Sequence, residues 1–191
     1  AAERILSLLD IPKLINDAPD ASELTIGKGD KSDISYAKVG FTYGKETALG
    51  DVSFKASAGQ IVALVGPSGA GKTTIINLLP RFYDVTAGMI SVNGQDIRNL
   101  TIESLRAHIA LVSQEAILFE DTVAANIGFG RRDATDEDII AAAKDAAAHD
   151  FIMALPNGYQ TQVGAMGNRL SGGQRQRISI ARAMLKDAPI L

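Results

Sequence analysis

The stretch GPSGAGKT, residues 66–73, decides how the rest of the chain is interpreted. It fits the pattern G-x-x-x-x-G-K-[ST], in which glycines carry no Cβ and let backbone N–H groups turn toward phosphate oxygens. The predicted helix that follows would direct the positive end of its dipole at the same anion. A plain glycine-rich turn is the alternative, and the lysine and threonine at their fixed positions argue against it. The stretch therefore predicts a binding site for nucleotide phosphates.

Each residue type in this phosphate loop has an expected task. Lys72 would reach the β- and γ-phosphates, and the Thr73 hydroxyl would be a ligand of Mg²⁺. Thr74 could add a further phosphate contact. The remaining contacts would come from the loop backbone at Gly66, Ser68, Gly69, Ala70 and Gly71.

The composition describes one ordinary globular domain. The chain has 191 residues, of which 46% are apolar and 21% charged, and these values support a hydrophobic core and argue against disorder. The formal net charge of −3 gives no sign of a nucleic-acid partner. Because the chain has no cysteine and only 2 histidines, disulfides and thiolate sites are excluded and a multi-histidine metal site is not expected.

No apolar run approaches the roughly 18 residues that a membrane-spanning helix needs. The first residues, AAER, do not resemble a signal peptide. We expect the chain by itself to be soluble, so that any membrane role would come from a partner or from a segment outside the chain.

Short or alternating apolar runs predict the strands. These lie at residues 34–43, 48–54, 61–65, 88–92, 109–112 and, as the beginning of a strand, 189–191. The first two would be antiparallel, and the third would be a buried strand that leads into the phosphate loop. The dipeptide Asn93-Gly94 after the fourth is a tight-turn signal.

Helical spacing and alanine-rich composition predict the helices. They lie at residues 3–11, 73–79, 104–108, 136–149 and 171–185. The whole stretch from Glu115 to Leu155 is alanine-rich and expected to be mainly helical. By contrast, the polar residues 16–33 predict a linker or loop.

A second glycine-rich motif, LSGGQ at residues 170–174, begins the last predicted helix. A serine hydroxyl and glycine N–H groups at a helix N-terminus form a potential second anion site. The plainer interpretation is a serine N-cap followed by two flexible residues. The spacing after the phosphate loop and the surrounding pattern favour the anion site.

Together the two motifs make the chain similar to the ATP-binding domains of ABC transporters, in the exporter branch near lipid A and multidrug exporters. The resemblance extends over almost the whole chain. The segments that carry it include residues 41–43, 52–54, 81–84, 93–94, 111–114, 118–119, 126–127, 155–156 and 171–182. In that family two such domains pair head to tail, as a homodimer or a heterodimer. Each ATP is held between the phosphate loop of one copy and the signature of the other.

The resemblance implies further site residues. Tyr43 would stack on adenine, with a core aromatic as the alternative, and Gln114 would contact Mg²⁺ or the attacking water, with a strand-end polar residue as the alternative. Ser171 and Gly173 would contact the γ-phosphate bound by the partner, and Gly172 would belong to the same ATP-binding motif. Gln174 would lie nearby, and Lys72 and Gln114 would be the catalytic residues. His108 and His149 match no catalytic position and are expected to be structural or surface residues.

The resemblance also implies the layout. Residues 1–33 would be a linker helix and loop from a transmembrane domain outside this chain, and residues 34–191 the ATP-binding domain. Within it, residues 34–114 and 171–191 would form the catalytic core and residues 115–170 a helical subdomain. The expected fold class is α/β: a P-loop NTPase core of the ABC type with a mixed, largely parallel sheet, an N-terminal antiparallel β subdomain and an inserted helical subdomain, truncated at its C-terminus.

The implied function is ATP hydrolysis with Mg²⁺ that powers export of a lipid or drug-like substrate, at the cytoplasmic face of a membrane such as the bacterial inner membrane. One alternative is a truncated module that binds ATP without hydrolysing it. Another is a non-transport ABC ATPase of chromosome maintenance, repair or translation, against which the short stretch 115–170 argues. A third is a stand-alone importer ATPase, against which the segment before Ile34 and residues 113–119 argue.

Two departures from the family pattern matter. Ala165 stands where such exporters usually carry a glutamate, in a loop thought to touch the membrane domain. In addition, the family continues past an apolar strand with an aspartate that holds Mg²⁺ through water and a glutamate that serves as general base, whereas this sequence ends at Leu191.

Overall fold

The computed structural model describes residues 15–27, 30 and 32–191. The helix expected at residues 3–11 lies outside this part. The chain forms two compact units, of which the first ends at Arg106 and the second begins at Ala107. Each unit is described by itself.

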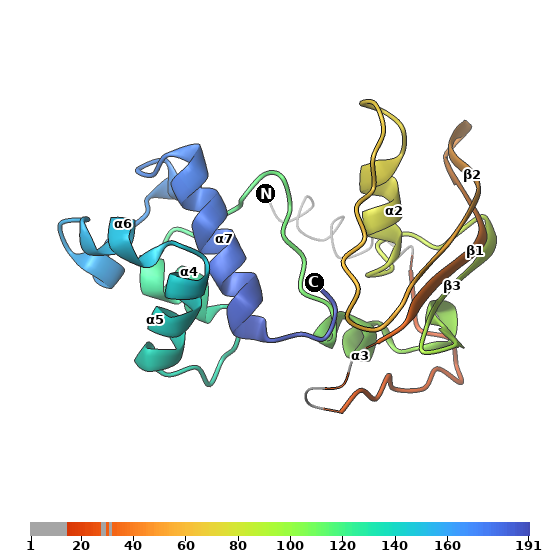
Figure 1. Ribbon diagram of the computed structural model, residues 1–191, viewed down its shortest axis with the longest axis horizontal. Coiled ribbons are helices and arrows are strands. Elements are labelled where there is room, and N and C mark those ends of the chain that lie inside the picture. The colour runs from red at the N-terminus through yellow and green to blue at the C-terminus, as the bar shows by residue number, and fades with distance from the viewer. Residues whose placement is uncertain (1–14, 28–29, 31) are drawn as a thin grey trace, which may run out of the picture. The chain divides into compact units, whose positions relative to one another are not determined.

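The first unit is built on a four-stranded sheet with the order β2-β1-β3-β4 (Figure 1). Its strands are β1 (Ile34–Tyr43), β2 (Glu46–Ala56), β3 (Ala87–Val92) and β4 (Gln95–Asp96). Every neighbouring pair is antiparallel. The two antiparallel strands predicted near the N-terminus and the strand before Asn93 are therefore confirmed.

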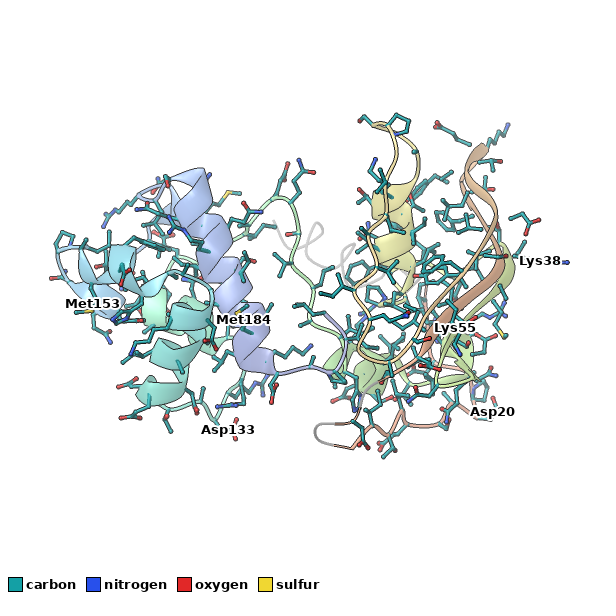
Figure 2. The ribbon with its side chains drawn as sticks, viewed as in Figure 1. Asp20, Lys38, Lys55, Asp133, Met153 and Met184 are labelled. Carbon is teal, nitrogen blue, oxygen red and sulfur yellow. The ribbon has the colours of Figure 1, made fainter. Side chains whose placement is uncertain are left out.

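Alternation along β1 explains which side of this sheet forms the core. Tyr36, Val39 and Phe41 are 4%, 0% and 5% exposed. The pairing shifts register between Tyr36 and Val39, where Lys38 has a left-handed backbone with φ 49°. The Lys38 side chain points away from the sheet (Figure 2). The irregularity thus returns the apolar side chains to the buried face after a charged residue.

Turn and helix signals in the first unit also hold. Asn93 and Gly94 both have positive φ, 49° and 79°, as a tight hairpin turn requires. The predicted helix after the phosphate loop is α2 (Lys72–Leu78), and the next predicted helix is α3 (Ile102–Ala107), preceded by the 3-10 turn η1 (Ile97–Asn99). The Tyr36 hydroxyl donates to the carbonyl of Ile75 at 2.9 Å and so ties α2 to β1.

The predicted buried strand at residues 61–65 is wrong for this structure. The segment has no strand assignment, and Ile61 and Val65 are 100% and 92% exposed. A strand needs a neighbour for its backbone N–H and C=O groups, and the described sheet places none beside these residues. For the same reason the largely parallel sheet expected around the phosphate loop is not among the described strands.

Residues 15–24 run along the first unit with irregular backbone, as expected for a loop. Ser22 forms an isolated parallel bridge with Leu100. The Asp17 carboxylate accepts a hydrogen bond from the Ile102 N–H at 2.7 Å. Leu24 is 3% exposed. This part of the predicted linker therefore packs on the rest of the first unit.

The second unit is helical (Figure 1). Its elements are α4 (Val123–Gly128), α5 (Asp136–Asp145), α6 (His149–Met153), the 3-10 turns η2 (Gly158–Gln160) and η3 (Ala165–Gly167), and α7 (Gly172–Lys186). α7 packs against α4 and α5. The core of the unit is apolar, and its fully buried members are Val123, Ile127, Ala143, Ala148, Ile152, Val163, Ile178 and Ala181. The predicted helical stretch and the predicted last helix are confirmed.

The helix expected at residues 136–149 is wrong in its extent. It divides into α5 and α6 because Ala147 has a left-handed backbone with φ 51°. The Ala148 N–H bonds to the carbonyl of Ala143 at 2.7 Å and the Ala147 N–H to that of Lys144 at 2.9 Å. This pair of bonds is a Schellman ending, which closes α5 without a glycine.

The strand expected at residues 109–112 is also wrong in its extent. Ile109 forms only an isolated parallel bridge with Ile190. The Ala110 N–H donates to the carbonyl of Ile190 at 2.8 Å, and the Ile190 N–H donates to that of His108 at 3.2 Å. The two extended segments thus pair in parallel over a single step, again with no further strand beside them in the described part of the second unit.

Candidate nucleotide-binding site

The phosphate loop is exposed and ends in a helix without a side-chain cap. Gly69 and Gly71 have φ 80° and 82°, and Gly71 is the residue that precedes α2. Among the described residues, the N–H groups of Gly69, Gly71 and Thr73 have no protein acceptor. Unpaired donors at the start of a helix are satisfied by water or by an anion, so these groups suit phosphate oxygens.

The Lys72 side chain folds back over this loop. Its Nζ donates to the carbonyls of Gly66 and Pro67 at 2.8 and 2.6 Å. A full positive charge therefore lies beside the free N–H groups. Thr73 is exposed whereas Thr74 is 7% exposed, so the hydroxyl that a ligand can reach is that of Thr73.

Gly71 also anchors the loop to the sheet. A Cβ at this position would lie 2.6 Å from Leu49 Cδ2 and 2.9 Å from the Ala48 carbonyl oxygen. Only glycine permits this approach, and only glycine adopts its backbone angles without strain. Leu49 pairs across the hairpin with Phe41. The loop is therefore packed on the end of β1 and β2 that carries Phe41.

Tyr43 lies at that same end of β1 and is not a core residue. It is 41% exposed. Phe41 approaches its ring at 4.6 Å and an interplanar angle of 88°, and Tyr83 at 5.3 Å and 87°. The contacts from Gly71 through Leu49 and Phe41 to Tyr43 bring an exposed aromatic ring and the phosphate loop to one end of the hairpin. The alternative of a buried strand aromatic is wrong.

The signature begins α7 in a different way. The Ser171 hydroxyl accepts from the Gln174 N–H at 3.3 Å, and the Gln174 side-chain oxygen accepts from the Ser171 N–H at 2.8 Å. This is a complete capping box. The Ser171 O–H proton is left to donate, and the N–H groups of Gly172 and Gly173 lie in the exposed first turn. The plain N-cap role and a role in anion binding are thus compatible.

Gln114 is exposed and lies outside any strand, so its alternative as a strand-end residue is wrong. Within the second unit it lines a cavity of about 470 Å³ together with Gly172, at the start of the signature helix. Ala165, at the position that departs from the exporter pattern, lines the same cavity, as does Arg175, which donates to the Leu170 carbonyl at 2.6 Å. The cavity joins the two predicted site regions of this unit.

Of the two histidines, His149 has the structural side-chain contact that a non-catalytic role predicts. The His149 Nδ1 lies 2.9 Å from the Tyr159 hydroxyl, and the His108 carbonyl accepts from Ile190. In the described part of the chain no three His, Asp, Glu or Cys side chains gather as metal ligands.

Sequence reasoning missed the polar pair that supports the signature helix. Asn126 is 1% exposed. Its side-chain oxygen accepts from the Phe119 N–H at 2.9 Å, and its side-chain nitrogen donates to the carbonyls of Phe119 and Thr122 at 3.0 and 2.9 Å. An asparagine within an apolar helical run is the signal that could have identified it, because a buried amide needs partners.

Arg182 on α7 is the other member of this pair. Its guanidinium donates to the Asn126 carbonyl at 2.8 Å, to the Asn126 side-chain oxygen at 3.0 Å and to the Ile117 carbonyl at 3.2 Å. The same group lies 5.5 and 5.9 Å from the ring centres of Phe119 and Phe129. Burial lowers the pKa of Arg182. The segment after Gln114 is thereby fastened to the helix that carries the signature.

None of the helices in the described ranges is long and apolar enough to cross a bilayer.

Comparison with known proteins shows what the chain is similar to. It is 50% identical over 191 residues to the "ATP-dependent lipid A-core flippase" of Desulfotalea psychrophila, covering 100% of this chain and 33% of that protein. It is 52% identical to the flippase of the same name from Legionella pneumophila, covering 100% of this chain and 32% of that protein. It is 49% identical to "ATP-binding cassette sub-family B member 6" of Mesocricetus auratus, covering 99% and 22%.

A solved structure described as a bacterial Atm1-family ABC exporter with ATP bound matches with a TM-score of 0.93 and 44% identity, over 100% of this chain and 33% of that one. The chain thus has the ABC-type nucleotide-binding fold with an N-terminal antiparallel β subdomain, and it spans about a third of the length of the flippases that it matches. The family described as "ABC transporter" matches residues 49–191. On this evidence the chain belongs to the ABC transporter family.

Proposed function

We propose that this chain binds ATP with Mg²⁺ as the nucleotide-binding part of an exporter, in which hydrolysis of that ATP powers transport. The observation that carries the proposal is the phosphate loop, where the Lys72 ammonium lies at 2.8 Å from the Gly66 carbonyl beside unpaired N–H groups. A triphosphate would exchange those carbonyl contacts for charge-assisted bonds to its β- and γ-oxygens, which are the stronger interaction.

Mg²⁺ fits the donors that the chain offers. It prefers hard oxygen ligands and usually keeps several waters next to substrate phosphates. The exposed Thr73 hydroxyl and the exposed Gln114 amide are of that kind, and no cluster of three acidic or histidine side chains competes for the ion in the described residues. When bound, Mg²⁺ would neutralise charge on the transferring phosphate.

The signature would act on the ATP of a second, head-to-tail domain. The Ser171 hydroxyl proton and the N–H groups of Gly172 and Gly173 face outward, while the Gln174 side chain holds the turn in place. Donors that the chain's own fold leaves unused can be offered to an anion from outside. Whether the second domain is identical or merely related, the arrangement gives each ATP two sets of donors.

The relatives suggest what is carried. Two are named as lipid A-core flippases, so we infer a lipid or lipid-like substrate, moved by a transmembrane domain of the same protein in a bacterial inner membrane. The nucleotide-binding part would then lie at the cytoplasmic face.

Calorimetric titration of the full chain with Mg-ATP tests the proposal. Lys72→Ala should weaken binding by more than about tenfold, because it removes the only full charge from the loop. Lys144→Ala, which removes an exposed lysine from α5, is the matched control and should leave binding unchanged. Equal affinity in the Lys72→Ala variant and the unsubstituted chain would contradict the proposal.

Hydrolysis is measured on the same proteins. Turnover that Lys72→Ala abolishes supports an active ATPase. Binding without turnover above that variant supports the alternative of a module that binds ATP without hydrolysing it.

A further inference from the structure

Three aromatic side chains meet at the end of β1. The ring centres of Phe41 and Tyr43 are 4.6 Å apart, those of Tyr43 and Tyr83 5.3 Å, and those of Phe41 and Tyr83 5.4 Å. Phe41 is 5% exposed, whereas Tyr43 and Tyr83 are 41% and 38% exposed. The cluster therefore has a buried base and two rings that reach solvent.

The interplanar angles around Tyr43 say more about how its ring is held than the distances between ring centres do. Phe41 and Tyr83 stand at 88° and 87° to the plane of Tyr43. Two edge-to-face contacts fix both the position and the tilt of a ring, whereas an exposed tyrosine at a strand end otherwise has several rotamers. Tyr43 is thus held in one orientation before any ligand arrives.

The segment that supplies Tyr83 is itself fixed. Arg81 is 4% exposed and donates to both carboxylate oxygens of Asp84 at 2.7 and 3.2 Å. The same guanidinium donates to the carbonyls of Asn16 and Arg98 at 3.1 and 3.3 Å. Tyr83 lies between the two members of this ion pair, so its backbone cannot move without breaking buried bonds.

A second arginine fastens the segment from α3. Arg106 donates to the carbonyls of Pro80 and Arg81 at 2.8 and 2.9 Å. Its guanidinium lies 5.1 Å from the ring centre of Phe82. Phe82, the neighbour of Tyr83, thus packs on the arginine and is absent from the three-ring cluster.

We propose that Tyr83 is a positioning residue for nucleotide binding: it holds the Tyr43 ring in the orientation in which that ring stacks on the base. The inference rests on the proposed function. It adds that the affinity for the base depends on the segment after α2 as well as on β1. Tyr83 acts through Tyr43 and need not touch the nucleotide itself.

Calorimetry of the full chain with Mg-ATP and with Mg-tripolyphosphate, which has the phosphates but no base, separates the two parts of the affinity. Tyr83→Leu should weaken ATP binding by about three- to tenfold, the range that an ordered aromatic contact supports. Binding of tripolyphosphate should not change. Tyr83→Phe should retain the affinity because the ring edge, not the hydroxyl, makes the contact. Tyr159→Leu, which removes a tyrosine of the second unit that lies outside this cluster, is the matched control and should bind ATP normally.

A double-mutant cycle tests whether Tyr83 acts through Tyr43. Tyr43→Leu should weaken ATP binding at least as much as Tyr83→Leu, and the double variant should be no worse than Tyr43→Leu alone. If the melting temperature of the leucine variant falls, Tyr83→Met, closer in size and more flexible, repeats the measurement.

The outcomes separate the two proposals. Normal ATP binding by Tyr83→Leu and Tyr83→Met, alongside weakened binding by Tyr43→Leu, overturns the role of Tyr83 and leaves the proposed function intact. An equal loss for ATP and tripolyphosphate also overturns it, because Tyr83 would then act on the phosphate loop. Failure of the unsubstituted chain to bind either ligand overturns the proposed function and the inference together.

Discussion

The two glycine-rich motifs of this chain begin their helices in opposite ways. The seven-residue α2 follows Gly71, which has a left-handed backbone and provides no side-chain cap. The 15-residue α7 follows Ser171, which closes a reciprocal capping box with Gln174. The start of α2 therefore has no side-chain acceptor for its N–H groups, whereas the signature satisfies the Ser171 and Gln174 N–H groups itself and leaves the Gly172 and Gly173 N–H groups for a ligand.

This difference suggests that the two motifs have different parts in nucleotide binding. Unsatisfied N–H groups at an uncapped helix start lower the stability of the folded chain. Binding of an anion to these groups offsets that loss. A capped start is rigid before binding and can present its remaining donors without rearrangement. We infer that the phosphate loop responds to nucleotide and that the signature is preformed.

The largest effect should come from removing the support beneath the signature. Arg182→Met removes three hydrogen bonds from a half-buried guanidinium and leaves the Asn126 and Ile117 acceptors without it. We expect a loss of about 2–3 kcal/mol in the stability of the second unit. Urea unfolding, monitored by amide hydrogen exchange in α7, measures this loss of unfolding free energy. Arg177→Met, which removes one exposed hydrogen bond to the Ala147 carbonyl and the contact of the guanidinium with the Phe151 ring, is the control and should cost about 1 kcal/mol. Equal losses would show that Arg182 gives α7 no special support.

The second prediction compares one glycine from each motif. Gly71→Ala places a Cβ at 2.6 Å from Leu49 Cδ2 at φ 82°, so we expect about 2 kcal/mol of destabilisation and weaker ATP binding. A Cβ at Gly173 meets nothing within 4 Å, so Gly173→Ala should leave the stability of α7 unchanged or slightly higher. Thermal unfolding measures the stability of the two variants, and titration calorimetry measures their ATP binding. A neutral Gly71→Ala would mean that the loop is not packed on β2 as described.

The third prediction concerns the cap itself. Ser171→Ala removes the side-chain acceptor for the Gln174 N–H and should destabilise α7 by about 1 kcal/mol. Ser171→Thr keeps a hydroxyl and should restore most of it. Hydrogen exchange at the first turn of α7 measures the change. If both variants fray equally, the capping box is not what orders the signature.

The smallest effect is a difference in pH dependence between the capping boxes of α5 and α7 in the second unit. The Thr135 N–H and Arg131 hold the pKa of the Asp138 carboxyl below its ordinary value of 3.8. A carboxylate of this kind stabilises the folded state above its ordinary pKa, and the contribution is lost as the pH falls through the lower folded pKa. The box of α7 uses the uncharged Gln174. Below about pH 4, protection should therefore fall more at the start of α5 than at the start of α7. Asp138→Asn should abolish the difference, and a difference that persists in Asp138→Asn would assign it to another group.

Local signals predicted most of the elements. Alternation predicted β1 with its observed bounds, and Ser171 with the glycines that follow it predicted the start of α7 to within one residue. The strands predicted at residues 61–65 and 109–112 were wrong, because strand formation depends on neighbouring strands that a local apolar run does not reveal. Ala147 was missed because alanine has the strongest helix propensity and yet adopts a left-handed backbone here.

The candidate site divides in the same way. Gly71, Lys72 and Ser171 could be found because their motifs are continuous in sequence. The bonds between Asn126 and Arg182 join residues 56 positions apart, so only the folded chain reveals them. The same holds for Tyr83 and Tyr43, which come from different elements. The nucleotide-binding roles of the site residues stay predictions until the variants are measured.

Amide hydrogen exchange with and without saturating Mg-ATP, at a concentration where the chain is monomeric, tests the contrast between the two motifs most directly. We expect exchange at residues 66–74 to slow on addition of nucleotide, because the N–H groups of Gly69, Gly71 and Thr73 gain phosphate acceptors. The N–H groups of Ser171 and Gln174 should be protected already and change little. Unchanged exchange at residues 66–74 under saturating nucleotide would contradict a phosphate loop that binds ATP.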